Sequence, residues 1–155
     1  MQFYKLGAIF SLIIASACTQ TYQRTLTGPL IVSGHANLIT DGYSRGCENV
    51  SLLPVTPAVE KLFQFSGDRL NDYFIDRVSF YRAIRGSEAW KSRQQIPCVG
   101  NGAFSFEKLP AAQYFLVAEV TWSMRWAQHG GYLLRKISIS KDTNDVYLSI
   151  VNNHA

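Results

Sequence analysis

The sequence lacks the patterns that identify several large classes of protein. Its longest apolar run, residues 6–17, covers twelve residues, whereas a helix needs about twenty to cross a bilayer. No segment repeats at a fixed period, which argues against solenoids and propellers. The motifs of P-loop proteins, His-x-x-x-His metalloenzymes and Gly-x-Ser-x-Gly hydrolases are all absent. Neither a spanning helix nor a motif-defined enzyme is therefore expected.

Charge and histidine are also scarce. Lys and Arg number 15 against 11 Asp and Glu, a formal net charge of +4, and they form no basic run. That balance lacks the dense basic footprint of a nucleic-acid-binding protein. The three histidines, His35, His129 and His154, fall in a predicted strand, a predicted loop and the tail, and nothing places one beside a Ser or Cys. We therefore predict no catalytic residue, no metal site, no cofactor and no nucleic-acid partner.

The first 17 residues have the pattern of a secretory signal peptide, because Lys5 precedes the apolar run and small residues close it. The sequence Ala15-Ser16-Ala17-Cys18 resembles a bacterial lipobox, after which Cys18 becomes the N-terminus and carries lipid. Lipid on Cys18 would hold the protein on a membrane without a spanning helix. Ordinary cleavage near Cys18, which releases a soluble protein, is the alternative.

The chain has three cysteines, an odd number for an exported protein. If Cys18 is lipidated, Cys47 and Cys98 remain as a pair in an oxidising compartment, where they can form a disulfide. Such a bond would close a loop of about fifty residues and contribute roughly 4 kcal/mol. Two free buried thiols are the alternative. A metal site is disfavoured, because no His or second Cys lies at ligand spacing from either residue.

Alternating apolar residues predict one all-β domain over residues 28–151, after a polar tether at 18–27 and before a tail at 152–155. About seven short strands separated by turns indicate a β-sandwich. The predicted strands cover residues 30–38, 49–55, 104–107, 114–122, 132–140 and 145–151.

Two segments predict something other than a plain strand. Thr56 as a cap and Pro57 in the first turn predict a short inserted helix near residues 57–65. Between residues 69 and 85 the apolar spacing favours a helix capped by Asp68, whereas abundant Tyr, Phe, Val and Ile favour a strand. Helix or strand stays open for that segment.

A longer pattern adds a family resemblance. The run Gly102-x-Phe104-x-Phe106-x-x-Leu109-Pro110-Ala111-x-x-Tyr114-x-Leu116 resembles the signature of carboxypeptidase regulatory-like domains. Those domains have a transthyretin-like, or prealbumin-like, β-sandwich fold and mostly serve as binding or stabilising modules. Ala112 stands where the family usually has glycine. The resemblance covers roughly residues 28–151 and implies a sandwich and an accessory role rather than a reaction. It also implies an extended strand through residues 90–96 that leads towards the Gly102 hairpin.

Two surfaces could bind a partner. Trp122, Arg125, Trp126 and His129 lie in or beside a predicted loop at 123–129, and tryptophan and arginine are common in binding hot spots. The alternative is that Trp122 lies in the core and Trp126 covers the mouth of the sandwich. A second cluster is more simply a solvated face, because acidic residues offset most of its charge. It comprises Arg69, Tyr73, Arg77, Tyr81, Arg82, Arg85, Trp90, Lys91 and Arg93.

Together these features predict a non-enzymatic, lipid-anchored protein of the bacterial cell envelope, similar to outer-membrane lipoproteins with a carboxypeptidase regulatory-like domain. Its β-sandwich would be a binding or structural accessory module. The membrane, through Cys18, and an unidentified envelope protein or glycan are the expected partners. The alternatives are a small periplasmic hydrolase that uses His129 in a loop pocket and a secreted, soluble adhesin-like module.

Overall fold

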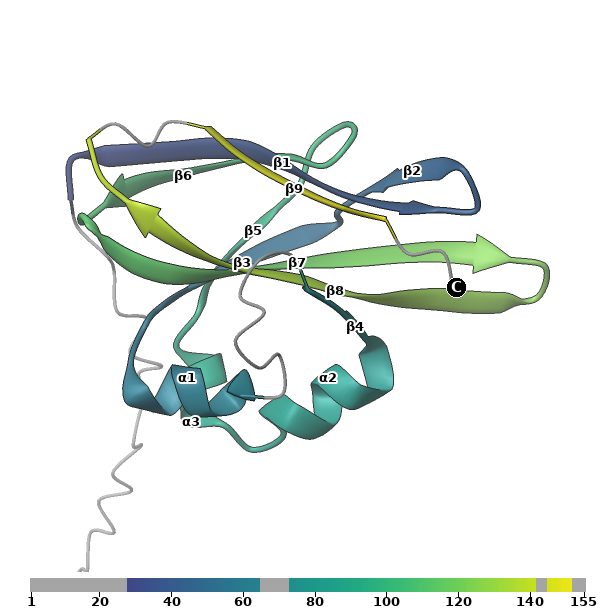
Figure 1. Ribbon diagram of the computed structural model, residues 1–155, viewed down its shortest axis with the longest axis horizontal. Coiled ribbons are helices and arrows are strands. Elements are labelled where there is room, and N and C mark those ends of the chain that lie inside the picture. Colours follow the sequence, from purple (N-terminus) through teal and green to yellow (C-terminus); the bar gives the residue numbers. More distant parts are fainter. Residues whose placement is uncertain (1–27, 65–72, 142–144, 152–155) are drawn as a thin grey trace, which may run out of the picture.

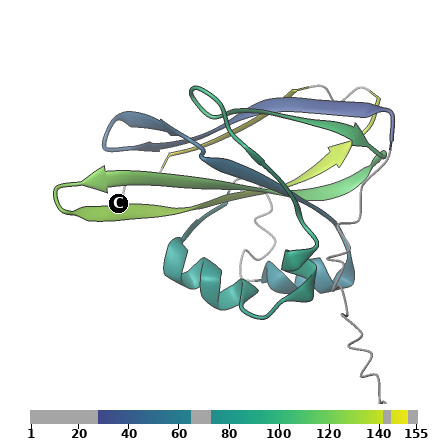
Figure 2. The ribbon, with the colours of Figure 1, turned by 180° about the vertical axis from the view of Figure 1, so that it is seen from behind.

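The computed structural model describes residues 28–64, 73–141 and 145–151, which form two packed sheets and a layer of helices (Figure 1). The first sheet contains β1 (Leu30–Thr40), β2 (Tyr43–Gly46), β6 (Ala103–Leu109) and β9 (Asp145–Val151). The second has the order β4 (Tyr73–Asp76), β8 (Ala127–Ile139), β7 (Ala112–Met124), β3 (Asn49–Pro54) and β5 (Gln94–Pro97). The helices α1 (Pro57–Leu62), α2 (Arg77–Ile84) and α3 (Glu88–Lys91) cover the outer face of the second sheet (Figure 2).

The predicted all-β sandwich is confirmed. The start of the inserted helix is also confirmed, because α1 begins at Pro57. The described residues form nine strands where about seven were expected, because β2 was not foreseen and β4 lies in the segment left open between helix and strand. The strand expected at 90–96 is wrong in its first part, since Glu88–Lys91 forms α3, capped by Ser87, and the strand begins only at Gln94. Thr56 caps α1 by accepting a hydrogen bond from the Val59 amide at 3.2 Å, as predicted. The predicted helix end at residue 65 and the cap at Asp68 lie outside the described residues. Within the described part of the chain, no helix is long and apolar enough to span a membrane.

Strand β1 organises the first sheet. Its side chains alternate between a buried and an outward set, as the sequence predicts, and Val32, Ala36 and Leu38 are completely buried. On one side β1 pairs in parallel with β9, and on the other it pairs antiparallel with β6 and then β2. The buried set of β9, which includes Leu148, faces the same core. One outer face of the sandwich is therefore open to solvent.

The second sheet is buried on both faces. Along β7, Leu116, Ala118 and Val120 pack between the two sheets, whereas Phe115 and Val117 pack against the helices. Such two-sided burial needs a continuous apolar run rather than an alternating one. The helices are therefore part of the core, because they cover the apolar face that the first sheet leaves exposed.

The segment left open between helix and strand contains both. Tyr73–Asp76 forms β4, which pairs with β8, and the next residue begins α2. The Asp76 carboxylate accepts a hydrogen bond from the Ser79 amide at 2.9 Å and so caps the helix. Hydrogen bonds from Ser79 also lower the pKa of Asp76. Neither pattern alone described the segment, because a four-residue strand leads directly into a helix.

The signature around Gly102 lies in the centre of the sandwich. Phe104 and Phe106 are buried between the sheets, and a side chain at Gly102, where φ is 86°, would meet the Ala36 carbonyl oxygen at 2.3 Å. Tyr114 is fully buried, and its hydroxyl donates a 2.9 Å hydrogen bond to the Pro110 carbonyl. Tyr114 therefore holds the corner at Pro110, directly after β6, in place.

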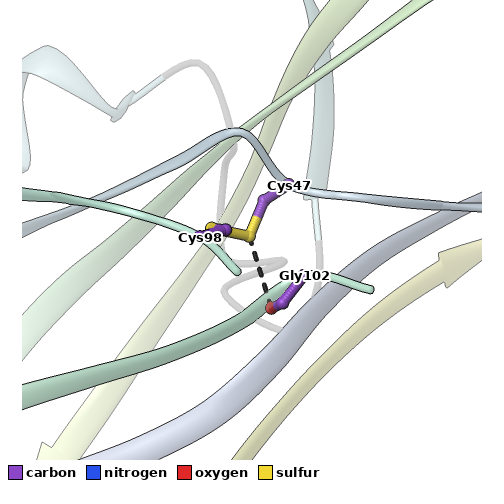
Figure 3. The surroundings of a disulfide bond; sticks show 3 residues. All are labelled: Cys47, Cys98 and Gly102. Atoms are coloured by element: carbon purple, nitrogen blue, oxygen red, sulfur yellow. Dashed lines mark hydrogen bonds between the residues drawn. A yellow bond between two sulfur atoms is a disulfide. The ribbon is translucent and has the colours of Figure 1, made fainter. Parts of the chain in front are cut away.

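The predicted disulfide between Cys47 and Cys98 is confirmed (Figure 3). It joins the β2–β3 connection to the residue that follows β5, with 5.8 Å between the two Cα atoms. The Cys47 sulfur also lies 3.4 Å from the Gly102 carbonyl oxygen at the start of β6. The bond therefore ties elements of both sheets at one place.

Replacing both Cys47 and Cys98 with alanine is expected to lower the free energy of unfolding by about 4 kcal/mol, because the crosslink spans 51 residues of the unfolded chain. Urea unfolding with and without a thiol reductant measures the effect. The reductant should lower the midpoint of the parent chain and leave the midpoint of the double variant unchanged. A parent midpoint that does not respond to reductant contradicts a stabilising role for the bond.

Candidate functional site

The surface predicted around Trp126 lies on a β-ribbon rather than on a loop. Strand β7 continues to Met124 and β8 begins at Ala127, so the predicted loop at 123–129 is wrong and only Arg125 and Trp126 form the turn. The segment resembled a loop because its side chains are mostly polar and exposed, although the backbone ladder runs to the tip. We call residues 120–131 the ribbon.

The four predicted residues do not form one binding surface. Trp122 is only 8% exposed and stacks on His129, with ring centroids 5.9 Å apart. The Arg45 guanidinium of β2 lies 5.4 Å from the centre of the Trp122 ring. Trp122 belongs to the core between the sheets, which agrees with the alternative given for it above. Trp126 does not cover the sandwich mouth, because it is fully exposed beside Arg125 at the tip.

The ribbon turn contains backbone strain. Arg125 has φ of 55°, in the left-handed region that hairpin turns of this length usually fill with glycine. Arg125→Gly is therefore expected to raise the free energy of unfolding by about 1 kcal/mol. Denaturant unfolding measures this change, with Trp126→Gly as the control, since Trp126 lacks a positive φ and should gain nothing. A destabilised Arg125→Gly variant would contradict the strained turn.

A hollow between the helices and the second sheet brings together a different set of side chains. Its volume is about 110 Å³, and β3, β5, β7, β8, α2 and the segment around α3 all contribute to its walls. We call it the recess, and its lining is Asn49, Ser51, Tyr81, Trp90, Arg93, Gln95, Val117, Glu119 and Tyr132. Sheet register explains the convergence, because Asn49 and Tyr132 flank Glu119 on the two neighbouring strands.

Glu119 is the acidic centre of the recess. Its Oε1 atom accepts hydrogen bonds from the Tyr132 hydroxyl at 3.2 Å and from Arg77 Nη2 at 3.4 Å. Burial raises the pKa of Tyr132 above its ordinary value, and Tyr81 and Glu119 add to the shift. Tyr132 therefore stays a neutral phenol that donates to the carboxylate, and Glu119 is held in one position.

Arg93 is fixed just as firmly on the other wall. Its Nε and Nη2 atoms donate to Gln95 Oε1 at 3.0 and 2.7 Å, and Nη1 donates to the Trp90 carbonyl at 3.2 Å. The guanidinium also lies 4.5 Å from the centre of the Trp90 ring, and that ring packs edge-on against Phe80. These contacts order the polar groups before any ligand arrives, which lowers the entropy cost of binding.

The composition of the recess fits an uncharged, polyhydroxylated ligand. Its lining contains one carboxylate and one guanidinium, and Arg77 pairs with Glu119 from outside the lining, so no large excess of either charge faces a ligand. Amides and hydroxyls of Asn49, Gln95 and Ser51 can pair with ligand hydroxyls, and Tyr81, which is 51% exposed, offers an apolar ring. Within the described residues, no three His, Cys, Asp or Glu side chains gather as metal ligands.

A larger, more open hollow of about 550 Å³ lies between β4 and α2. It begins at Tyr73, directly after residues 65–72, which the structure does not describe. We therefore assign it no role.

Sequence reasoning found only part of the recess. Tyr81, Trp90 and Arg93 belong to the cluster interpreted as a solvated face, whereas Arg82 and Arg85 of that cluster are exposed and Arg69 lies outside the described residues. Glu119 and Tyr132 were not singled out. The available signal was Glu119 itself, a charged residue inside the apolar run of β7. The predicted lipidation site, Cys18, also lies outside the described residues.

The chain matches no protein-family model, and no curated protein matches it. Among solved structures it is similar to a chain from Pseudomonas aeruginosa described as a "putative carbohydrate binding protein". The two chains share 17% sequence identity with a TM-score of 0.57, over 80% of this chain and 90% of that one. At this identity the likeness shows a shared fold alone, and that fold is an all-β sandwich.

Proposed function

We propose that this protein is a non-enzymatic, lipid-anchored module of the bacterial outer membrane that binds an uncharged saccharide in the recess. The observation that carries the proposal is the recess itself, where ordered polar groups and aromatic rings meet in a hollow with balanced charge. Saccharides present both hydroxyls and apolar ring faces, so they need both kinds of group. The neighbour described as carbohydrate binding supports the same ligand class.

The lipid anchor rests on the sequence around Cys18 and on the resemblance to envelope lipoproteins with a carboxypeptidase regulatory-like domain. Its role would be to keep the binding domain at the membrane surface through residues 18–27. A hydrolase that uses His129 is the less favoured function, because His129 stacks on Trp122 along the ribbon instead of facing a loop pocket. An envelope protein bound at the exposed tip by Arg125 and Trp126 is the second candidate.

Saccharide binding is tested with the full chain, purified from membranes in a detergent whose head group is not a sugar. Calorimetry with glucose and N-acetylglucosamine oligosaccharides should show binding, and glucuronate oligosaccharides should bind less. Tyr81→Ala should weaken binding about tenfold, the loss expected for an aromatic contact worth somewhat more than 1 kcal/mol. Tyr147→Ala, which removes a tyrosine 63% exposed on the first sheet, is the matched control and should change nothing.

Equal losses in the two tyrosine variants would contradict the recess as the binding site. Failure of all uncharged saccharides to bind would contradict the ligand class itself.

The anchor is tested by Cys18→Ser. The parent chain should fractionate with membranes and show the added mass of acyl chains in intact-mass spectrometry, because Cys18 would carry them. The variant should lose that added mass. A parent chain that begins near residue 18 without acyl groups would favour the secreted, soluble module and leave saccharide binding unaffected.

A further inference from the structure

The polar face of the recess continues beyond the helices along the ribbon. Side chains two residues apart on a strand point to the same face, so Thr121 and Ser123 follow Glu119 on β7. On β8, Gly130 pairs with Thr121 and Gln128 pairs with Ser123. These four residues, which we call the ribbon face, therefore extend the recess wall away from the helices.

The ribbon face is not covered by neighbouring strands. Pairing of β3 with β7 ends at Asn49 and Glu119, and pairing of β4 with β8 ends at Asp76 and Gly131. Beyond those positions β7 and β8 pair only with each other among the described strands, and the ribbon runs past α2 (Figure 1). Ser123 and Gln128 are accordingly exposed.

None of the four residues of the ribbon face carries a charge. A Cβ atom at Gly130 would meet the Val120 carbonyl oxygen at 2.7 Å, so glycine lets the two backbones lie close and leaves no protruding side chain. The Thr121 hydroxyl is hydrogen-bonded to the Glu48 carboxylate. Glu48 and Glu119 border the path, Arg77 pairs with Glu119, and Arg93 and Arg125 lie near its two ends, so both signs of charge are present and no dense field of one sign favours an ionic ligand.

The path ends at the exposed ring of Trp126. Met124, the last residue of β7, lies five positions after Glu119, which is about 17 Å along an antiparallel strand. That length is several sugar rings rather than one. Trp126, fully exposed at the far end, presents the largest aromatic surface on the tip.

We propose that the recess and the ribbon face form one extended site for a linear, uncharged oligosaccharide. One terminal sugar lies in the recess, the chain follows the ribbon face, and a distant sugar stacks on Trp126. This inference rests on the proposed saccharide-binding function. It also gives the strained turn a role, because the turn holds Trp126 at the end of the path.

The test measures affinity against ligand length with the full chain. The probes are β-1,4-linked glucose and N-acetylglucosamine series, each as monosaccharide, disaccharide, tetrasaccharide and hexasaccharide. Affinity should rise about tenfold or more from monosaccharide to hexasaccharide, because each added contact increases the binding free energy. Trp126→Ala should remove that gain and leave monosaccharide affinity unchanged, whereas Trp126→Phe should retain part of it. Tyr81→Ala should weaken binding at every length.

Any other result rejects either the extended site or the ligand class. If monosaccharide and hexasaccharide bind equally, or if Trp126→Ala binds the hexasaccharide as tightly as the parent, the site holds one sugar and the extended path is wrong. Saccharide binding in the recess would still stand in that case. If Trp126→Ala weakens the monosaccharide and Tyr81→Ala does not, the tip is the primary site. If no length binds, both the inference and the proposed ligand class fail.

Discussion

The structure depends on the burial of the second sheet from both sides. Strand β7 is apolar on both faces from Tyr114 to Ala118, and β8 from Tyr132 to Leu134, so neither the first sheet nor the helices alone can cover them. Burial of apolar area is the dominant favourable term in folding, and a face left open would cost that term. The three layers are therefore one cooperative unit, and the helices belong to the fold rather than to an appendage.

The candidate site lies where this two-sided burial ends. At Glu119 the helix-covered face of β7 changes from apolar to polar, and beyond it the ribbon loses its cover on that side. A half-buried carboxylate loses part of its hydration, and hydrogen bonds from Tyr132 and Arg77 replace the lost contacts with water. The same hydrogen bonds that make Glu119 tolerable in the sheet also fix its position for a ligand. Stability and pre-organisation thus have a common origin in the recess.

Local patterns predicted the sandwich well. The alternation in β1 and β9, the run from Gly102 to Tyr114 and the pairing of Cys47 with Cys98 each depend on neighbours in sequence or on simple counting. The ribbon was missed because exposed polar strands lack the apolar alternation by which strands are identified. The segment at 69–85 was ambiguous because a four-residue strand leads directly into a helix.

The recess could not be predicted for a different reason. Tyr81 and Trp90 are distant in sequence from Glu119 and Tyr132, and only the register of β7 with β8 and the packing of α2 on the sheet bring them together. Long-range packing of this kind has no local signature. The resemblance to a family of accessory domains indicated a fold, and a fold does not specify a ligand.

The most direct measurement uses the three tryptophans as position-specific probes. Trp90 lines the recess, Trp126 is exposed at the ribbon tip and Trp122 is buried in the core, so their indole N–H signals in an NMR spectrum report three separate places. Addition of an uncharged hexasaccharide should shift the signals of Trp90 and Trp126 and leave that of Trp122 in place, whereas a monosaccharide should shift Trp90 alone. A spectrum in which Trp90 does not respond to any saccharide would contradict the recess as the binding site.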